Sequence, residues 1–225
     1  MALTKAFAVG ASNTASGTTL TTGTFDSTGY THIVCFGKHE GAAGATQTFT
    51  DNKGSSGQTY YTEESHSVAS LSGQMGMFPI ASPGTGHTVT MTLSSARDYR
   101  GMVVWLVNAT GGSLTLDVQS VAEGNSNAPD AGSLVTTAAT VSFMGVGEYD
   151  AGTFTAGSGW TEDYDSNHFG QSRSDASGTL DPACSWTVTN NWVACSASFK
   201  ESGGAGTNPK GPLSNPLAGP FGGPI

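Results

Sequence analysis

Apolar and polar residues alternate along most of the chain, which predicts β-strands. In residues 88–93, Val89, Met91 and Leu93 alternate with three threonines. A period of two places the apolar side chains on one face of a strand and the polar ones on the other. The same reasoning predicts strands at residues 18–25, 30–37, 46–50, 59–62, 68–80, 102–107, 114–118, 140–146, 184–189 and 192–199.

The apolar run and the turn signals refine this picture. Residues 102–107 (MVVWLV) are apolar throughout, which is typical of a central strand covered on both faces. Asn190 and Asn191 tolerate the positive φ of a tight hairpin turn, so we expect them to join the two strands beside them. No segment has a helical period. The sequence therefore predicts an all-β fold, a two-sheet antiparallel β-sandwich of jelly-roll-like or immunoglobulin-like form.

The end of the chain follows another pattern. From residue 212 onward proline occupies every fourth position and an apolar residue follows each proline, a spacing that excludes helix and removes backbone donors. We expect a sandwich domain over residues 1–200 and a Gly/Pro-rich extended arm over residues 201–225. Near polyproline geometry the arm would reach on the order of 60 Å along a partner. The predicted partner-binding residues are Pro212, Leu213, Pro216, Leu217, Pro220, Phe221, Pro224 and Ile225.

Composition narrows the function classes. Only 11% of the residues are charged, against roughly a quarter in ordinary domains, and the net charge is −9 without any run of Lys or Arg. These values exclude a nucleic-acid binder. The longest strongly apolar run is too short to cross a membrane, and no secretory signal is visible at the start, so we expect a soluble protein made in a cytosol. The odd set of Cys35, Cys184 and Cys195 is interpreted as buried core thiols.

Metal sites and hydrolytic motifs are weakly represented. There is no G-x-S-x-G motif and no metal-binding histidine spacing, and His39-Glu40 is interpreted as a surface turn. Residues 162–167 (EDYDSN) begin like a calcium loop, but His168 stands where the loop needs glycine and Ser174 where it needs glutamate. An irregular cation site or a solvated acidic loop remain the two interpretations of this segment.

Two sugar-related functions would each require particular residues. A glycosidase needs two carboxylates across a cleft; Glu148 is the best single candidate, and no second carboxylate occurs in a comparable setting. We therefore expect no enzymatic activity and no cofactor. A carbohydrate-binding module needs only exposed aromatic rings, whereas Trp105 and Trp192 are expected in the core. The candidate platform consists of Tyr60, Tyr61, Trp160 and Tyr164.

Several local patterns occur together in a recognisable order. They are Gly23-Thr24-Phe25, Asp51-x-x-Gly54 with Thr59-Tyr60, residues 86–93 (GHTVTMTL), residues 154–161 (FTAGSGWT) and residues 192–200 (WVACSASFK). Over roughly residues 5–200 the chain resembles a β-sandwich module of phage virion proteins, in capsid decoration and tail, and of bacterial surface proteins. The resemblance implies a sandwich used for display or attachment, and it brings no catalytic residues.

The resemblance and the arm together favour a bacteriophage virion protein, made in the host cytoplasm. We expect a capsid decoration (cement) protein on the outer shell, where an acidic surface suits the outside of a particle better than a face packed on DNA. Its expected partners are the major capsid protein or other virion subunits, with homo-oligomers on the particle. The alternatives are a tail or fibre component, and a carbohydrate-binding module with a glycan ligand.

Overall fold

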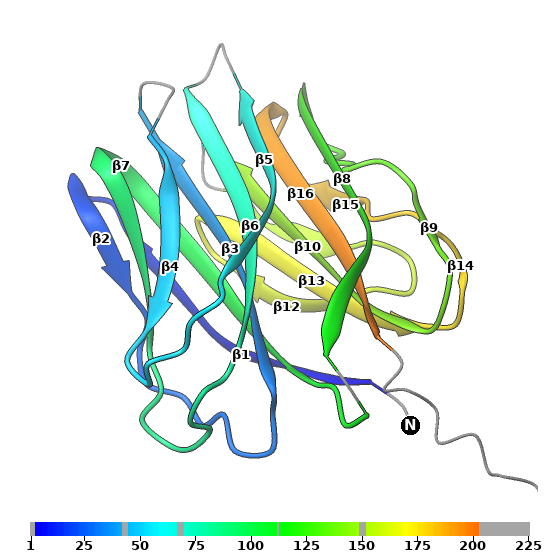
Figure 1. Ribbon diagram of the computed structural model, residues 1–225. Coiled ribbons are helices and arrows are strands. Elements are labelled where there is room, and N and C mark those ends of the chain that lie inside the picture. Colours follow the sequence, from blue (N-terminus) through cyan, green and yellow to red (C-terminus); the bar gives the residue numbers. More distant parts are fainter. Residues whose placement is uncertain (1–2, 42–44, 67–69, 112, 149–151, 203–225) are drawn as a thin grey trace, which may run out of the picture.

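The computed structural model describes residues 3–41, 45–66, 70–111, 113–148 and 152–202, with the backbone alone for residues 62–66. Two antiparallel sheets lie face to face, which confirms the predicted all-β sandwich (Figure 1). The first sheet runs in the order β1 (Thr4–Asn13), β7 (Val89–Asn108), β3 (His32–Glu40), β6 (Leu71–Pro79), β5 (Thr59–His66). The second sheet runs in the order β12 (Thr161–Asp165), β13 (His168–Asp175), β10 (Thr140–Glu148), β16 (Asn190–Glu201), β8 (Leu114–Ser126).

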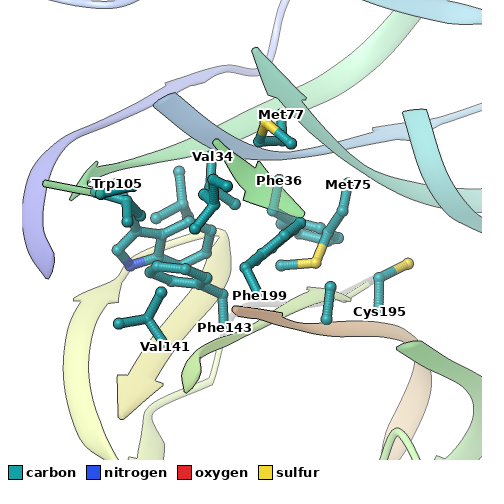
Figure 2. Packing of buried hydrophobic residues seen from close by; sticks show 14 residues of the cluster. Val34, Phe36, Met75, Met77, Trp105, Val141, Phe143, Cys195 and Phe199 are labelled. Carbon is teal, nitrogen blue, oxygen red and sulfur yellow. The ribbon is translucent and has the colours of Figure 1, made fainter. Parts of the chain in front are cut away.

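Aromatic rings fill the space between the two sheets. Trp105 is fully buried, as predicted, and its ring centroid lies 5.1 Å from that of Phe143, which in turn lies 6.2 Å from that of Phe199. Figure 2 shows these rings gathered with Phe36 between the strands. Gly145 on β10 makes room for Phe36, because a Cβ at that position would overlap the phenyl ring. Close packing at this point of the sandwich thus depends on the large Phe36 ring and on the lack of a side chain at Gly145.

A small outer layer covers the first sheet. The first half of β7 pairs with β2 (Gly17–Thr21) on one side and with β4 (Gln47–Asp51) on the other, and this layer packs on the outer face of the first sheet. The second half of β7 pairs with β1 and β3 inside the sheet. The two segments expected as separate strands, residues 88–93 and 102–107, therefore belong to one strand that passes from the cover into the sheet.

The side-chain alternation of β7 changes phase between its halves. Val89, Met91 and Leu93 at odd positions and Met102, Val104 and Leu106 at even positions all belong to one buried cluster. Strict alternation would have put the odd residues of both halves there. The change falls where Tyr99 has a φ of +46° and the pairing with β3 shifts register between Lys38 and Glu40. A local irregularity thus resets which face of the strand is apolar.

The second sheet also has a cover. Two short antiparallel pairs form it, β11 (Phe154–Ala156) with β15 (Cys184–Trp186), and β9 (Leu134–Thr136) with β14 (Gly178–Leu180). Trp186 stacks on Phe154 with ring centroids 5.2 Å apart, and both join the buried cluster that contains Trp192. The predicted burial of Trp192 is confirmed. Odd residues of β16 face the sandwich interior and even residues face this cover.

One local expectation is wrong, and three strands of the two main sheets were not predicted. The Asn190–Asn191 hairpin is wrong: β15 pairs with β11, and both asparagines lie within β16, where they pair with Ser126 and Asn125 of β8. The stacking of Trp186 on Phe154 explains why β15 belongs to the cover and not to β16. The sequence also did not indicate β1, whose apolar residues are mostly alanines, or the edge pair β12 and β13.

Candidate functional site

The eight predicted partner-binding residues, from Pro212 to Ile225, lie outside the described residues. The structure describes the point at which the arm begins. Ser202 donates two hydrogen bonds to the carbonyl oxygen of Ser113, 2.8 Å from its backbone N and 2.9 Å from its Oγ. Just before it, Lys200 Nζ donates to Asp117 Oδ1 at 2.6 Å. The arm therefore begins at a fixed point beside the start of β8.

The first strand begins at the same end of the sandwich. Thr4 pairs with Asn108 at the end of β7, and Leu3 packs against the buried cluster that contains Ala109 and Leu114. Leu114 pairs with Glu201, the last residue of β16. In Figure 1 the blue start of β1 and the orange end of β16 lie close together. The two ends of the described chain thus leave the sandwich from one region.

The four candidate sugar-stacking residues do not form a platform. Trp160 is only 8% exposed and belongs to the cover of the second sheet. Tyr61 packs edge-on against Phe199 in the interior, with centroids 5.3 Å apart. Tyr60 on β5 and Tyr164 on β12 occupy opposite edges of the sandwich. The predicted exposure is therefore wrong for Trp160, Tyr61 is half-buried, and Tyr60 and Tyr164 cannot stack on one sugar.

The acidic segment that resembled a calcium loop is an edge strand, so the solvated-loop interpretation is wrong. Asp163 turns inward, where its Oδ2 accepts hydrogen bonds from Trp105 Nε1 at 2.8 Å and from Ser172 Oγ. Burial raises the pKa of Asp163, and these hydrogen bonds offset part of the rise. Asp165 accepts a hydrogen bond from the backbone N of Phe154 at 3.3 Å. Among the described residues, no group of three potential metal-ligating side chains comes together.

His39 and Glu40, expected in a surface turn, are buried in β3. Neighbouring Lys38 is also buried, and its Nζ donates to Glu40 Oε1 at 2.9 Å and to the backbone O of Glu148 at 3.1 Å. Burial lowers the pKa of Lys38, and the carboxylates of Glu40 and Glu148 offset part of this effect. Burial, together with the nearby charge of Arg97, lowers the pKa of His39 to about 4.

Lys38, Glu40, Glu148 and His168 form what we call the Lys38 cluster. Glu148 is 1% exposed, and His168 on β13 is fully buried, with its pKa lowered to about 3 by burial and by the charge of Lys38. The sequence showed no second carboxylate to accompany Glu148. In the structure Glu40 takes this place, since Lys38 Nζ contacts both residues. Lys38 Nζ donates to Glu40 within β3 and to the backbone of Glu148 on β10, so this buried ammonium links the two sheets.

A second buried polar network lies where β4 ends, around Asp51. His87 Nδ1 lies 2.8 Å from Ser27 Oγ, and His87 Nε2 lies 2.8 Å from Asp51 Oδ2. The residue types match a hydrolase triad. The orientation of the imidazole ring differs, however. In a triad Nε2 faces the serine, whereas here Nδ1 faces Ser27 and Nε2 faces Asp51. Ser27 is also fully buried, and its hydroxyl bonds both the N and the O of Gly84.

Ser27, Asp51 and His87, which we call the His87 lock, therefore hold three turns together. Asp51 Oδ1 accepts hydrogen bonds from the backbone N–H groups of Lys53 and Ser55. Burial alone would raise the pKa of Asp51, but hydrogen bonds from Ser55 and His87 outweigh it and the pKa is lowered. Two separate sequence patterns, Asp51-x-x-Gly54 and Gly86-His87, thus contribute to the same hydrogen-bond network.

The three cysteines are buried, as predicted, and lie in three different apolar clusters. No helix in the described part of the chain is long and apolar enough to cross a bilayer. The fold and these polar networks define the class as an antiparallel β-sandwich with a small covering layer on each outer face. No family model, no curated protein and no solved structure matches the chain.

Proposed function

We propose that this chain is a non-enzymatic structural protein of a bacteriophage virion, a capsid decoration protein that binds the outer shell through its C-terminal arm. The observation that carries the proposal is the Pro-apolar repeat of residues 212–225, which follows an arm origin held by Ser202 and Ser113. A rigid sandwich presents such an arm from a defined point. The expected partner is the major capsid protein or another virion subunit.

Burial of the apolar side chains of the arm would compensate in part for the entropy lost when the arm becomes ordered. Complete burial of one large apolar side chain contributes roughly 1.5–3 kcal/mol, so Leu213, Leu217, Phe221 and Ile225 offset much of the entropy lost when the arm becomes ordered. Proline limits that loss because its φ is fixed in the free chain as well. Repetition of the contact over a symmetric shell adds avidity to a modest single-site affinity.

Co-sedimentation with purified particles that lack this protein tests the proposal. The full chain should sediment with particles, and a chain ending at Ser202 should remain in the supernatant while keeping its β-rich circular dichroism spectrum. The variant Leu213→Ser/Leu217→Ser/Phe221→Ser should bind at least tenfold more weakly. The matched control Ser214→Ala/Ala218→Ser changes neighbouring positions of the same arm and should bind normally.

Normal occupancy of particles by the chain ending at Ser202 would overturn the arm-mediated attachment. Electron cryo-microscopy of the reconstituted particles locates the bound protein. Density confined to the tail would replace capsid decoration by the tail or fibre alternative. Absence of particle binding together with saturable binding on a glycan array would replace it by carbohydrate recognition.

A further inference from the structure

The strand β1 forms an open edge of the first sheet. Within the described residues it pairs with β7 on one side, and no strand pairs with its other side. Its sequence, TKAFAVGASN, contains a single ionisable side chain, and Lys5 Nζ turns away to Ser172 Oγ at 2.7 Å. Phe7 is 38% exposed. An edge of this kind is a template for an additional strand.

The other three sheet edges carry protection that β1 lacks. β5 contains Glu63 and Glu64, and β12 is short and contains the exposed Glu162. β8 has a bulge next to Asp117 and also contains Glu123. Charges, bulges and short length are the usual means of keeping an edge unpaired. β1 has one bulge at Ala8 but no acidic residue, so it is the edge that most needs a cover.

The positions of the prolines in the sequence of the arm suit a strand at the edge of a sheet. In an extended strand, successive residues direct their N–H and C=O groups to opposite sides and their side chains to opposite faces. All four repeat prolines, at 212, 216, 220 and 224, have even numbers. Their missing N–H groups would therefore lie on one side, while the odd residues keep every donor on the other side. Prolines in sheets occur in this arrangement on edge strands, with the N–H side toward solvent.

We propose that, in the free protein, residues 212–225 of the same chain add to the outer edge of β1 as a parallel strand. The odd residues, which include Leu213, Leu217, Phe221 and Ile225, would supply both the pairing backbone groups and an apolar face. The strand side that lacks the proline N–H groups would face solvent, so no further strand could pair there. This inference concerns the protein before any partner binds, and it stands or falls independently of capsid attachment.

The reach of the chain fits this assignment. β16 ends where β1 begins, so the arm meets the start of β1 first. For a flexible Gly-rich linker as long as residues 203–211, chain statistics give an end-to-end distance of about 15–18 Å. As a strand, residues 212–225 would span ~46 Å, against ~33 Å for the ten residues of β1. A short linker of this kind creates a local concentration in the millimolar range, which favours the chain's own arm over that of a second copy.

Hydrogen exchange with mass spectrometry tests the assignment on the full chain without particles. Peptides that cover Thr4–Asn13 should exchange about tenfold faster or more in the chain ending at Ser202 than in the full chain. Peptides from the central strands β3 and β10 should be unchanged. Equal exchange of the β1 peptides in the two proteins would overturn the proposal.

A pair of arm variants tests the parity argument. Pro216→Leu/Leu217→Pro keeps the composition but moves one proline to the pairing side, so it should lose most of the β1 protection. Pro216→Ala changes only the solvent side and should keep it. Equal exchange in both variants would contradict the proposed register. Light scattering at the same concentrations should give the mass of one chain; a dimer with concentration-dependent protection would assign the added strand to a second copy and overturn the intramolecular assignment.

Discussion

His87 and Asp51 are joined by a hydrogen bond of 2.8 Å between Nε2 and Oδ2, although 36 positions separate them in the sequence. Both side chains are fully buried. The bond connects the turn after β4 with the turn before β7, and Ser27 connects both with the turn before β3. The geometry of this end of the sandwich therefore depends on a few polar atoms, and substitutions there should have large effects.

Replacement of Asp51 should destabilise the protein markedly. Asp51→Ala removes the acceptor for the His87 ring and for the N–H groups of Lys53 and Ser55. Buried donors left without a partner should reduce the free energy of unfolding by about 1–3 kcal/mol or more. Urea denaturation at pH 7 measures this. Asp26→Ala is the control, because Asp26 accepts a similar bond from Thr28 at an exposed turn; equal losses would contradict the prediction.

Asp51 and Asp163 should give opposite pH dependences of stability. The pKa of Asp51 is lowered from 3.8, so its contribution is present above pH 3.8 and disappears as the pH falls through its folded-state pKa. The pKa of Asp163 is raised, so stability is lost as the pH rises from 3.8 through the folded-state value. As the pH rises, the stability of Asp163→Asn relative to the wild type should therefore increase, whereas that of Asp51→Ala should decrease. Unfolding free energies measured from pH 2.5 to 7 test both signs.

The Lys38 cluster should respond differently to single and double substitution. Lys38→Met removes the ammonium that faces the buried Glu40 carboxylate, and breaking a buried ion pair from one side typically costs about 3–5 kcal/mol. Lys38→Met/Glu40→Gln removes both charges and should be more stable than the single variant. Urea denaturation of the two variants measures the difference. A double variant less stable than the single one would show that the pair does not act as a unit.

Gly145 should not tolerate even one additional carbon atom. The Cβ of Gly145→Ala would overlap the Phe36 ring in the interior, and such overpacking typically costs about 1–3 kcal/mol. Gly23→Ala is the matched control, since a Cβ there meets no atom within 4 Å. Thermal melting of both variants compares them. A melting temperature for Gly145→Ala equal to that of Gly23→Ala would mean that the core accommodates the methyl group.

The cysteines should be unreactive in the native protein. All three are buried, and burial raises the pKa of the Cys35 and Cys184 thiols, which removes the reactive thiolate. A colorimetric thiol reagent should therefore label none of them at pH 8 and all of them in denaturant. Ser56→Cys introduces one thiol at an exposed position and should label at once. Rapid labelling of the native wild type would contradict the predicted burial in solution.

Alternation along the chain predicted the fold class well, because buried strands leave a strong local signal. It identified the central strands, the buried tryptophans Trp105 and Trp192, and the buried thiols. The cover layers were not predicted, because they depend on which short segments stack across the sheet. Trp186 illustrates this: its ring stacks on Phe154, which lies 32 positions earlier in the chain.

The polar networks show the same limit. Asp51 and His87 were noted as parts of separate sequence patterns, but no local signal relates a turn after one strand to a turn before another. The sequence favours a surface turn for His39 and Glu40, whereas the structure buries Glu40 beside Lys38. Burial of a charged residue is set by its partner, and the partner is a property of the tertiary structure.

The phase change in β7 has a consequence for how this protein tolerates changes of length. Residues can be added at little cost to turns outside the His87 lock, since such a turn only has to close a loop. Between Leu93 and Met102 the number of residues determines which side chains enter each apolar cluster. Deletion of a single residue there would shift the alternation of one half of β7 relative to the other. The apolar side chains of one half would then point away from the buried cluster that they now share. In this segment the number of residues therefore matters for the fold as much as their chemical nature.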